Sequence, residues 1–133
     1  MINYVEILSQ NPNGVLATRE GEGIKTRVFQ YLFSEESKVY FCTNSQKPVY
    51  EQLMGNQNVS FCSFPADFSK VISISGKVVF VEDETLKARA LDENPSIKGM
   101  YKSADNPVFK LFYIDVKEIE TFDFTNGAEH YTV

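Results

Sequence analysis

Short runs rich in β-branched and aromatic residues recur along this chain, and they constrain its fold more than any other feature. Turn-forming residues bound each run, and segments of this kind are typical of β-strands. We expect strands at 15–18, 24–33, 39–43, 59–64, 71–81, 109–115 and 119–124. About seven strands with only three short helices predict a mainly β fold, an antiparallel barrel whose ends are covered by helices.

Three segments carry apolar residues at helical spacing instead. The first spans residues 2–10, where Asn3 is a candidate N-cap, and the second spans 45–53. The third begins at 83–85 and is expected to stop at Asn94 and Pro95. Within the long strand 71–81, Gly76 predicts a bend.

Length and charge limit the classes of protein to consider. A chain of 133 residues with 43% hydrophobic residues is expected to form a single domain, 1–133, with its own core. Its net charge of −5 disfavours nucleic-acid binding, because an acidic surface repels a phosphate backbone. No run approaches the roughly 20 apolar residues of a membrane span, and the opening residues lack the basic start of a secretory signal. We therefore expect a soluble, cytoplasmic protein.

The two cysteines, Cys42 and Cys62, lie in apolar stretches without a second Cys or a His at metal-binding spacing. They are interpreted as buried structural thiols, with a disulfide as the alternative. No metal site is predicted.

The segment 43–48 offers the clearest chemistry, because it joins a predicted strand to a predicted helix. Unpaired N–H groups and the positive end of a helix favour a bound phosphate, and Lys47 adds a cation there. The alternative is that Ser45 only caps the helix and that Lys47 is a solvated surface charge. Arg27 lies near the start of another strand and can bind a phosphate through two hydrogen bonds. The alternative interpretation is that the Arg27 side chain only faces solvent.

Five motifs occur here in an order that resembles the FMN-binding split-barrel family. That family includes pyridoxamine 5′-phosphate oxidases, small flavin-reductase-like proteins and nitroimidazole-reductase-like proteins. The motifs are Gly-Val-Leu-Ala-Thr at 14–18, Arg-Val-Phe at 27–29, Tyr-Phe-Cys-Thr-Asn-Ser-Gln-Lys at 40–47, Asn-Gln-Asn-Val at 56–59 and Ile-Ser-Gly-Lys at 74–77. The resemblance spans roughly residues 4 to 125 and implies a split β-barrel.

The resemblance also implies a cofactor, flavin mononucleotide (FMN), and a set of residues that hold it. Arg27, Ser45 and Lys47 would bind the phosphate. The ribityl chain and ring would be lined by Val28, Phe29, Gln30, Cys42, Thr43 and Asn44. Phe124 would lean on the flavin, and His130 would lie near the substrate. Gln46 stands where the family usually has a second basic residue, which predicts weaker phosphate affinity.

Relatives place the flavin at a two-fold interface, so the resemblance implies a homodimer. It implies an FMN-dependent oxidoreductase acting on a small-molecule acceptor or a nicotinamide cofactor, with no catalytic residue identified. Pyridoxamine phosphate oxidation itself is not expected, because no Arg follows Arg89 and Trp is absent. The alternatives are a flavin-binding protein that stores or senses the cofactor, and haem or deazaflavin binding. Arg27, Ser45 and Lys47 suit a single terminal phosphate and so favour FMN over deazaflavin.

Overall fold

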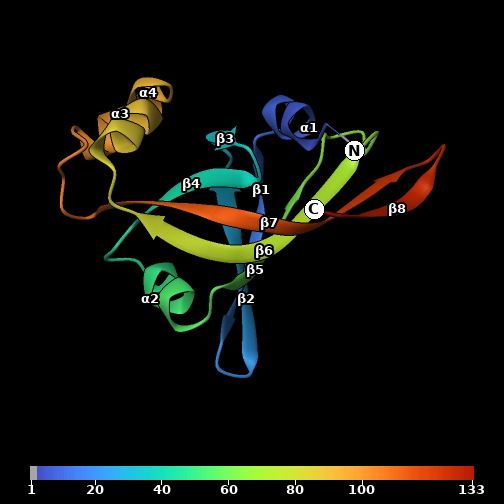
Figure 1. Ribbon diagram of the computed structural model, residues 1–133, viewed down its shortest axis with the longest axis horizontal. Helices are drawn as coiled ribbons and strands as arrows, with labels where there is room; N and C mark the ends of the chain where they lie inside the picture. The colour runs from blue at the N-terminus through green and yellow to red at the C-terminus, as the bar shows by residue number, and fades with distance from the viewer. Residues whose placement is uncertain (1–2) are drawn as a thin grey trace.

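The computed structural model describes residues 3–133, which form eight strands and four helices (Figure 1). In chain order they are α1 (Tyr4–Gln10), β1 (Asn13–Glu20), β2 (Gly23–Gln30), β3 (Phe33–Glu35), β4 (Lys38–Asn44), α2 (Pro48–Gly55), β5 (Asn58–Ser63), β6 (Val71–Val81), α3 (Glu84–Asp92), α4 (Pro95–Tyr101), β7 (Phe109–Asp123) and β8 (Gly127–Thr132). None of these helices combines the length and apolar character needed to cross a membrane.

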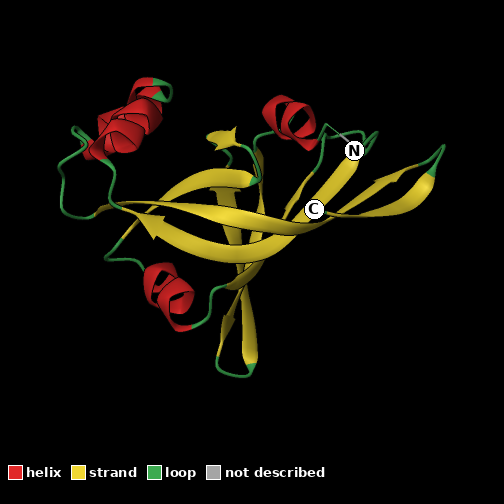
Figure 2. Ribbon diagram, viewed as in Figure 1, coloured by secondary structure: helices red, strands yellow, loops and turns green. Residues whose placement is uncertain are grey.

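All eight strands belong to one antiparallel sheet, and the helices lie around its outside (Figure 2). The strand order is β2-β1-β5-β6-β7-β4-β3, with β8 paired to β7. The register of β6 against β7 shifts between Ser75 and Gly76. The predicted bend at Gly76 is therefore confirmed, and the fold is the expected mainly β, antiparallel split barrel.

The sheet buries two groups of apolar side chains. The larger one lies within the barrel and includes Leu16, Phe41 and Phe112, all with no exposed surface. The smaller one joins α3 and α4 to the sheet and includes Leu91 of α3, Tyr101 of α4 and Phe109 of β7. Because each strand alternates its side chains between two faces, one strand can serve both groups.

The end of the chain differs from the expectation. The two closing strands predicted at 109–115 and 119–124 are one strand, β7, and a further strand, β8, follows it. The ladder continues across the expected gap at 116–118, because Val116 pairs with Gly76 and Glu118 pairs with Ser75 and with Thr132, while the register against β6 skips Lys117. Lys117 is thus an extra residue in β7, and a strand can accommodate such a bulge without ending.

Two other predictions were incomplete. Asn94 and Pro95 follow the end of α3 as expected, but Pro95 also begins α4, a helix that the sequence analysis missed. Proline suits the first helical position because the N–H it lacks would have no partner there. The expected strand 24–33 divides into β2 and β3, and Glu36, whose φ is 54°, lies in the turn between β3 and β4.

The caps of two predicted helices are confirmed. The Asn3 side chain accepts a hydrogen bond from the Glu6 N–H at 3.2 Å, and Asp83 accepts from the N–H groups of Thr85 and Leu86. Ile2, which the first predicted helix included, lies outside the described residues.

Candidate functional site

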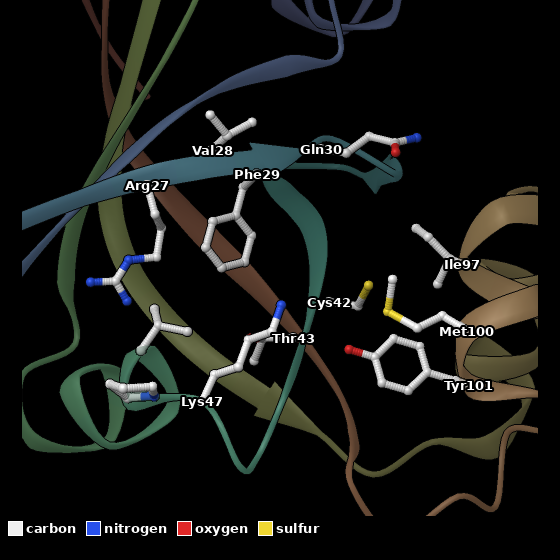
Figure 3. A pocket seen from close by; sticks show the side chains of 12 residues that line it. Arg27, Val28, Phe29, Gln30, Cys42, Thr43, Lys47, Ile97, Met100 and Tyr101 are labelled. Carbon is white, nitrogen blue, oxygen red and sulfur yellow. The ribbon is translucent and has the colours of Figure 1, made fainter.

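A cavity of about 490 Å³ lies between β2, the end of β4, the start of α2 and α4 (Figure 3). It is lined by Arg27, Val28, Phe29, Gln30, Cys42, Thr43, Lys47, Pro48, Val49, Ile97, Met100 and Tyr101. Four separate elements of the fold therefore meet around one space. A cavity of this size, apolar with a few convergent polar groups, is the usual form of a small-molecule site.

One end of the cavity is cationic. Arg27 reaches it from β2, and Lys47 occupies the N-cap position of α2. The Lys47 side chain makes no capping hydrogen bond, and Pro48 has no N–H to satisfy. Val49 lines the cavity within the first helical turn, where backbone N–H groups have no partner inside the helix. Two positive side chains and the positive end of a helix thus line one cavity, with the Lys47 ammonium pointing to its middle, near Thr43 (Figure 3). This arrangement favours an anion.

The structure corrects the interpretation of Ser45 as a helix cap. The helix begins three residues later than expected, at Pro48, and its N-cap residue is Lys47. The N–H of Ser45 instead donates to the carbonyl of Val108 at 2.9 Å. Asn44 forms a local turn, in which its Oδ1 accepts from the N–H of Gln46 at 2.8 Å. Neither Asn44 nor Ser45 lines the cavity.

The opposite end of the cavity is apolar and contains sulfur. Figure 3 shows the Cys42 thiol, the Met100 thioether and the Tyr101 hydroxyl lying close to one another at this end. Burial raises the pKa of Cys42 to about 12 and also raises the pKa of Tyr101. Both side chains are therefore neutral at physiological pH, and Cys42 is not a thiolate nucleophile there.

The wall of the cavity along β2 is fixed by aromatic packing. The Phe29 ring meets Phe41 and Phe112 edge-on, with ring centroids 6.3 Å and 5.8 Å apart. Gln30 follows it and donates from Nε2 to Asn94 Oδ1 at 3.0 Å, which ties β2 to the start of α4. The Gln30–Asn94 hydrogen bond thus links the strand and the helix that line the cavity.

The structure brings together seven residues that the sequence analysis proposed for the cofactor site. They are Arg27, Val28, Phe29, Gln30, Cys42, Thr43 and Lys47. It adds five that were missed, namely Pro48, Val49, Ile97, Met100 and Tyr101. Three of those five lie on α4, a helix that was not predicted.

Phe124 and His130 lie away from this cavity. Phe124 follows β7 and is 79% exposed, whereas the first residue of β7, Phe109, pairs with Asn44 near the cavity. His130 is exposed on β8, with its Nε2 3.9 Å from a carboxylate oxygen of Glu118. It lines a separate cavity of about 270 Å³. One chain alone therefore does not bring either residue to the first cavity.

The cysteines are free, as expected, but both are partly exposed and not fully buried. Cys42 is on the cavity wall, and Cys62 lies on β5 opposite Val15. Within residues 3–133, no cluster of His, Cys, Asp and Glu is arranged to hold a metal ion.

The fold and the cavity define a class of protein: a small antiparallel split barrel with one cationic and one apolar end to its main cavity. The family model for pyridoxamine 5′-phosphate oxidase matches residues 2–123. The chain therefore belongs to the pyridoxamine 5′-phosphate oxidase-like family. No curated protein matches it significantly in sequence.

Solved structures share this fold. A NimC/NimA family protein from Clostridium acetobutylicum is 28% identical, with a TM-score of 0.87 over 98% of this chain and 90% of its own. General stress protein 26 from Bacillus anthracis is 22% identical, with a TM-score of 0.82 over 97% and 95%. A pyridoxamine 5′-phosphate oxidase-related, FMN-binding protein from Nostoc punctiforme is 13% identical, with a TM-score of 0.66 over 90% and 78%. The last two likenesses show a shared fold.

Proposed function

We propose that the main cavity binds FMN, with the phosphate at the cationic end and the isoalloxazine ring toward the apolar end. The observation that carries this proposal is that Arg27, Lys47 and the N-terminus of α2 all line the same cavity. A phosphate dianion is the ligand that such a cluster favours. The chain as a whole carries a net charge of −5, so this positive end is a local feature.

The remainder of the cavity suits a planar, largely apolar ring. Phe29, Met100 and Ile97 supply apolar surface, and Thr43 adds a hydroxyl. The neutral Cys42 and Tyr101 side chains place no full charge at this end. FMN supplies hydride and electron transfer when bound, and the protein supplies binding and orientation. The family to which the chain belongs, and the FMN-binding relative from Nostoc punctiforme, support the same cofactor.

We further propose that the protein is an FMN-dependent oxidoreductase acting on a small-molecule acceptor, with a reduced nicotinamide as a candidate electron donor. Among the residues lining the cavity, none is a carboxylate or a histidine. Oxidation and reduction at a flavin need no acid–base triad from the protein, which is compatible with this lining.

A homodimer would complete the site. Phe124 follows the cavity end of β7, Phe109, by fifteen residues, which corresponds to roughly 50 Å along an extended strand before bending. If Phe124 contacts the flavin, it must come from a second copy of the chain. The side chains of Ile24 and Val28 on the edge strand β2 are 70% and 74% exposed, and apolar surface of this kind is often covered in an assembly.

The first test is the absorbance of the purified protein. We expect flavin bands, and loss of these bands in the Arg27→Ala/Lys47→Ala double variant. The fold should be retained, since the exposed Lys47 adds little stability and loss of the half-buried Arg27 leaves Gln52 Oε1 paired with Thr18. Lys25→Ala/Lys77→Ala is the matched control, because it removes the same charge at two exposed positions outside this cavity. Equal flavin occupancy in the two double variants would refute the site.

The second test separates the functional alternatives. Bleaching of the flavin bands by a reduced nicotinamide, followed by return of colour with an acceptor, supports an oxidoreductase. Stable flavin bands under the same conditions support storage or sensing of the cofactor. A haem spectrum in place of flavin bands would exclude both.

A further inference from the structure

Gln52 is a buried polar residue at the cationic end that no motif indicated. It lies on α2, is 8% exposed, and its side chain faces the β1–β2 hairpin. An amide in such a place needs hydrogen-bond partners, because an unpaired polar group is costly to bury. Its partners include Arg27, the cation that the proposed function assigns to the phosphate.

Each hydrogen bond of the Gln52 amide has an identified donor and acceptor. Gln52 Oε1 accepts from Arg27 Nη2 at 2.6 Å and from Thr18 Oγ1 at 3.1 Å. Gln52 Nε2 donates to Glu20 Oε2 at 2.5 Å. A flipped amide would set its NH₂ group against the Arg27 guanidinium and its oxygen against the Glu20 carboxylate. The partners therefore fix the amide in one orientation.

The arrangement has an electrostatic consequence for Arg27. A carboxylate at the same position would orient the guanidinium but would also neutralise it. The neutral amide orients Arg27 while the negative charge of Glu20 is held on the far side of the amide. The positive charge of Arg27 is thus left for another anion. Fixing this long side chain in advance also reduces the conformational entropy lost when the anion binds.

We infer that Gln52 is a positioning residue, which holds Arg27 oriented and not neutralised, so that the cavity selects phosphorylated over unphosphorylated flavin. This inference rests on the proposed FMN site. The residue itself does not line the cavity, and it acts on the ligand through Arg27.

The test compares FMN with riboflavin, which has the same ring and ribityl chain but no phosphate. Flavin-free protein is titrated with each, and quenching of flavin fluorescence gives the two dissociation constants. Gln52→Met keeps the length of the side chain and removes the amide. We expect it to weaken FMN binding about tenfold, the size of one charge-assisted hydrogen bond, and to leave riboflavin binding unchanged.

A carboxylate at the same position provides the matched variant. Gln52→Glu sets a negative charge beside Arg27 and near Glu20, so we expect a loss of FMN affinity larger than in Gln52→Met. In an Arg27→Met background, Gln52→Met should have no further effect on FMN, because the group it positions is gone. Thr18→Val, which removes one donor to Gln52 Oε1, should give a smaller loss of about threefold, again for FMN alone.

The outcomes separate this inference from the function on which it rests. Wild-type protein that binds FMN no more tightly than riboflavin overturns both. Wild-type protein that prefers FMN through Arg27, with the preference intact in Gln52→Met, overturns only the role of Gln52. Equal weakening of both flavins would show a structural role and also overturn it. If Gln52→Met does not fold, Thr18→Val decides: a loss restricted to FMN supports the inference, and its absence refutes it.

Discussion

Adding one methyl group at Gly76 is expected to destabilise the barrel, because this glycine lies where β6 and β7 change register. A Cβ built there would overlap the Asp115 carbonyl oxygen, and it would lie 2.9 Å from the carbonyl carbon and 3.1 Å from Ile114 Cγ2. Two of these three atoms belong to the backbone of the neighbouring strand. No rotamer change can relieve the overlap, so the strands themselves must separate.

The loss in the free energy of unfolding for Gly76→Ala follows from these contacts. Overpacking of a closely packed site costs about 1–3 kcal/mol. Separation of the strands also weakens adjacent ladder hydrogen bonds, each worth about 1 kcal/mol net. We expect Gly76→Ala to lower the free energy of unfolding by about 3 kcal/mol, which corresponds to a fall in Tm of roughly 12 °C for a domain of this size.

Gly99 gives a matched control with the opposite sign. It is exposed within α4, and an added Cβ would meet nothing within 4 Å. Alanine is favoured over glycine in a helix by about 1 kcal/mol, so Gly99→Ala should stabilise the protein. Urea unfolding of both variants, followed by circular dichroism, measures the two changes. A loss below about 1 kcal/mol for Gly76→Ala would refute the argument that the β6–β7 contact is rigid.

Three further predictions concern single side chains. Thr121 is 2% exposed and its Oγ1 has no hydrogen-bond partner among the described residues, so Thr121→Val should raise the free energy of unfolding by about 1 kcal/mol in urea, and a decrease would contradict this. The pKa of Asp123 is held below its usual range by the Asn126 N–H and the Lys70 ammonium, so its stabilising contribution is present above pH of about 4 and is lost as the pH falls below that value. Asp123→Asn should therefore lower Tm at pH 7, and the difference from wild type should shrink on acidification; a constant difference would exclude this role. The Cys42 thiol, with its pKa raised to about 12, should react with iodoacetamide at pH 8 at least about a hundredfold more slowly than free cysteine, as followed by mass spectrometry of the modified peptide.

Local sequence signals predicted those parts of the fold that depend on neighbouring residues. Asn3 and Asp83 cap helices as expected, because a cap requires only a side chain and the next turn of backbone. The continuous strand β7 was predicted as two strands, because its charged residues 117–118 look like a turn until the partner strands are known. Whether a charged residue continues a strand depends on which face is buried, and that is a property of the whole sheet.

The residues of the candidate site likewise divide into those that the sequence predicted and those that depend on the whole fold. Arg27 and Lys47 were identified from their types and their places beside a strand and a helix, and both line the cavity. The α4 residues Met100 and Tyr101 were missed because that helix was not predicted. Gln52 was missed for a different reason. A buried amide acquires its role only from groups that are distant in the sequence, and Thr18 is 34 residues away from it.

The path of α2 explains why these distant groups meet. β4 and β5 are consecutive in the sequence, but β6 and β7 stand between them in the sheet. The connection must therefore cross the barrel, and α2 does so while packing against β1. Its N-terminus stays at the end of β4, beside Lys47, and its second turn brings Gln52 to Thr18 on β1. Because Arg27 pairs with Leu16 on that same strand, the crossing helix brings its own positive end and the arginine of β2 to one place. The proposed phosphate site is thus a consequence of the strand order, and any change that shifts α2 should alter Lys47, Gln52 and Arg27 together.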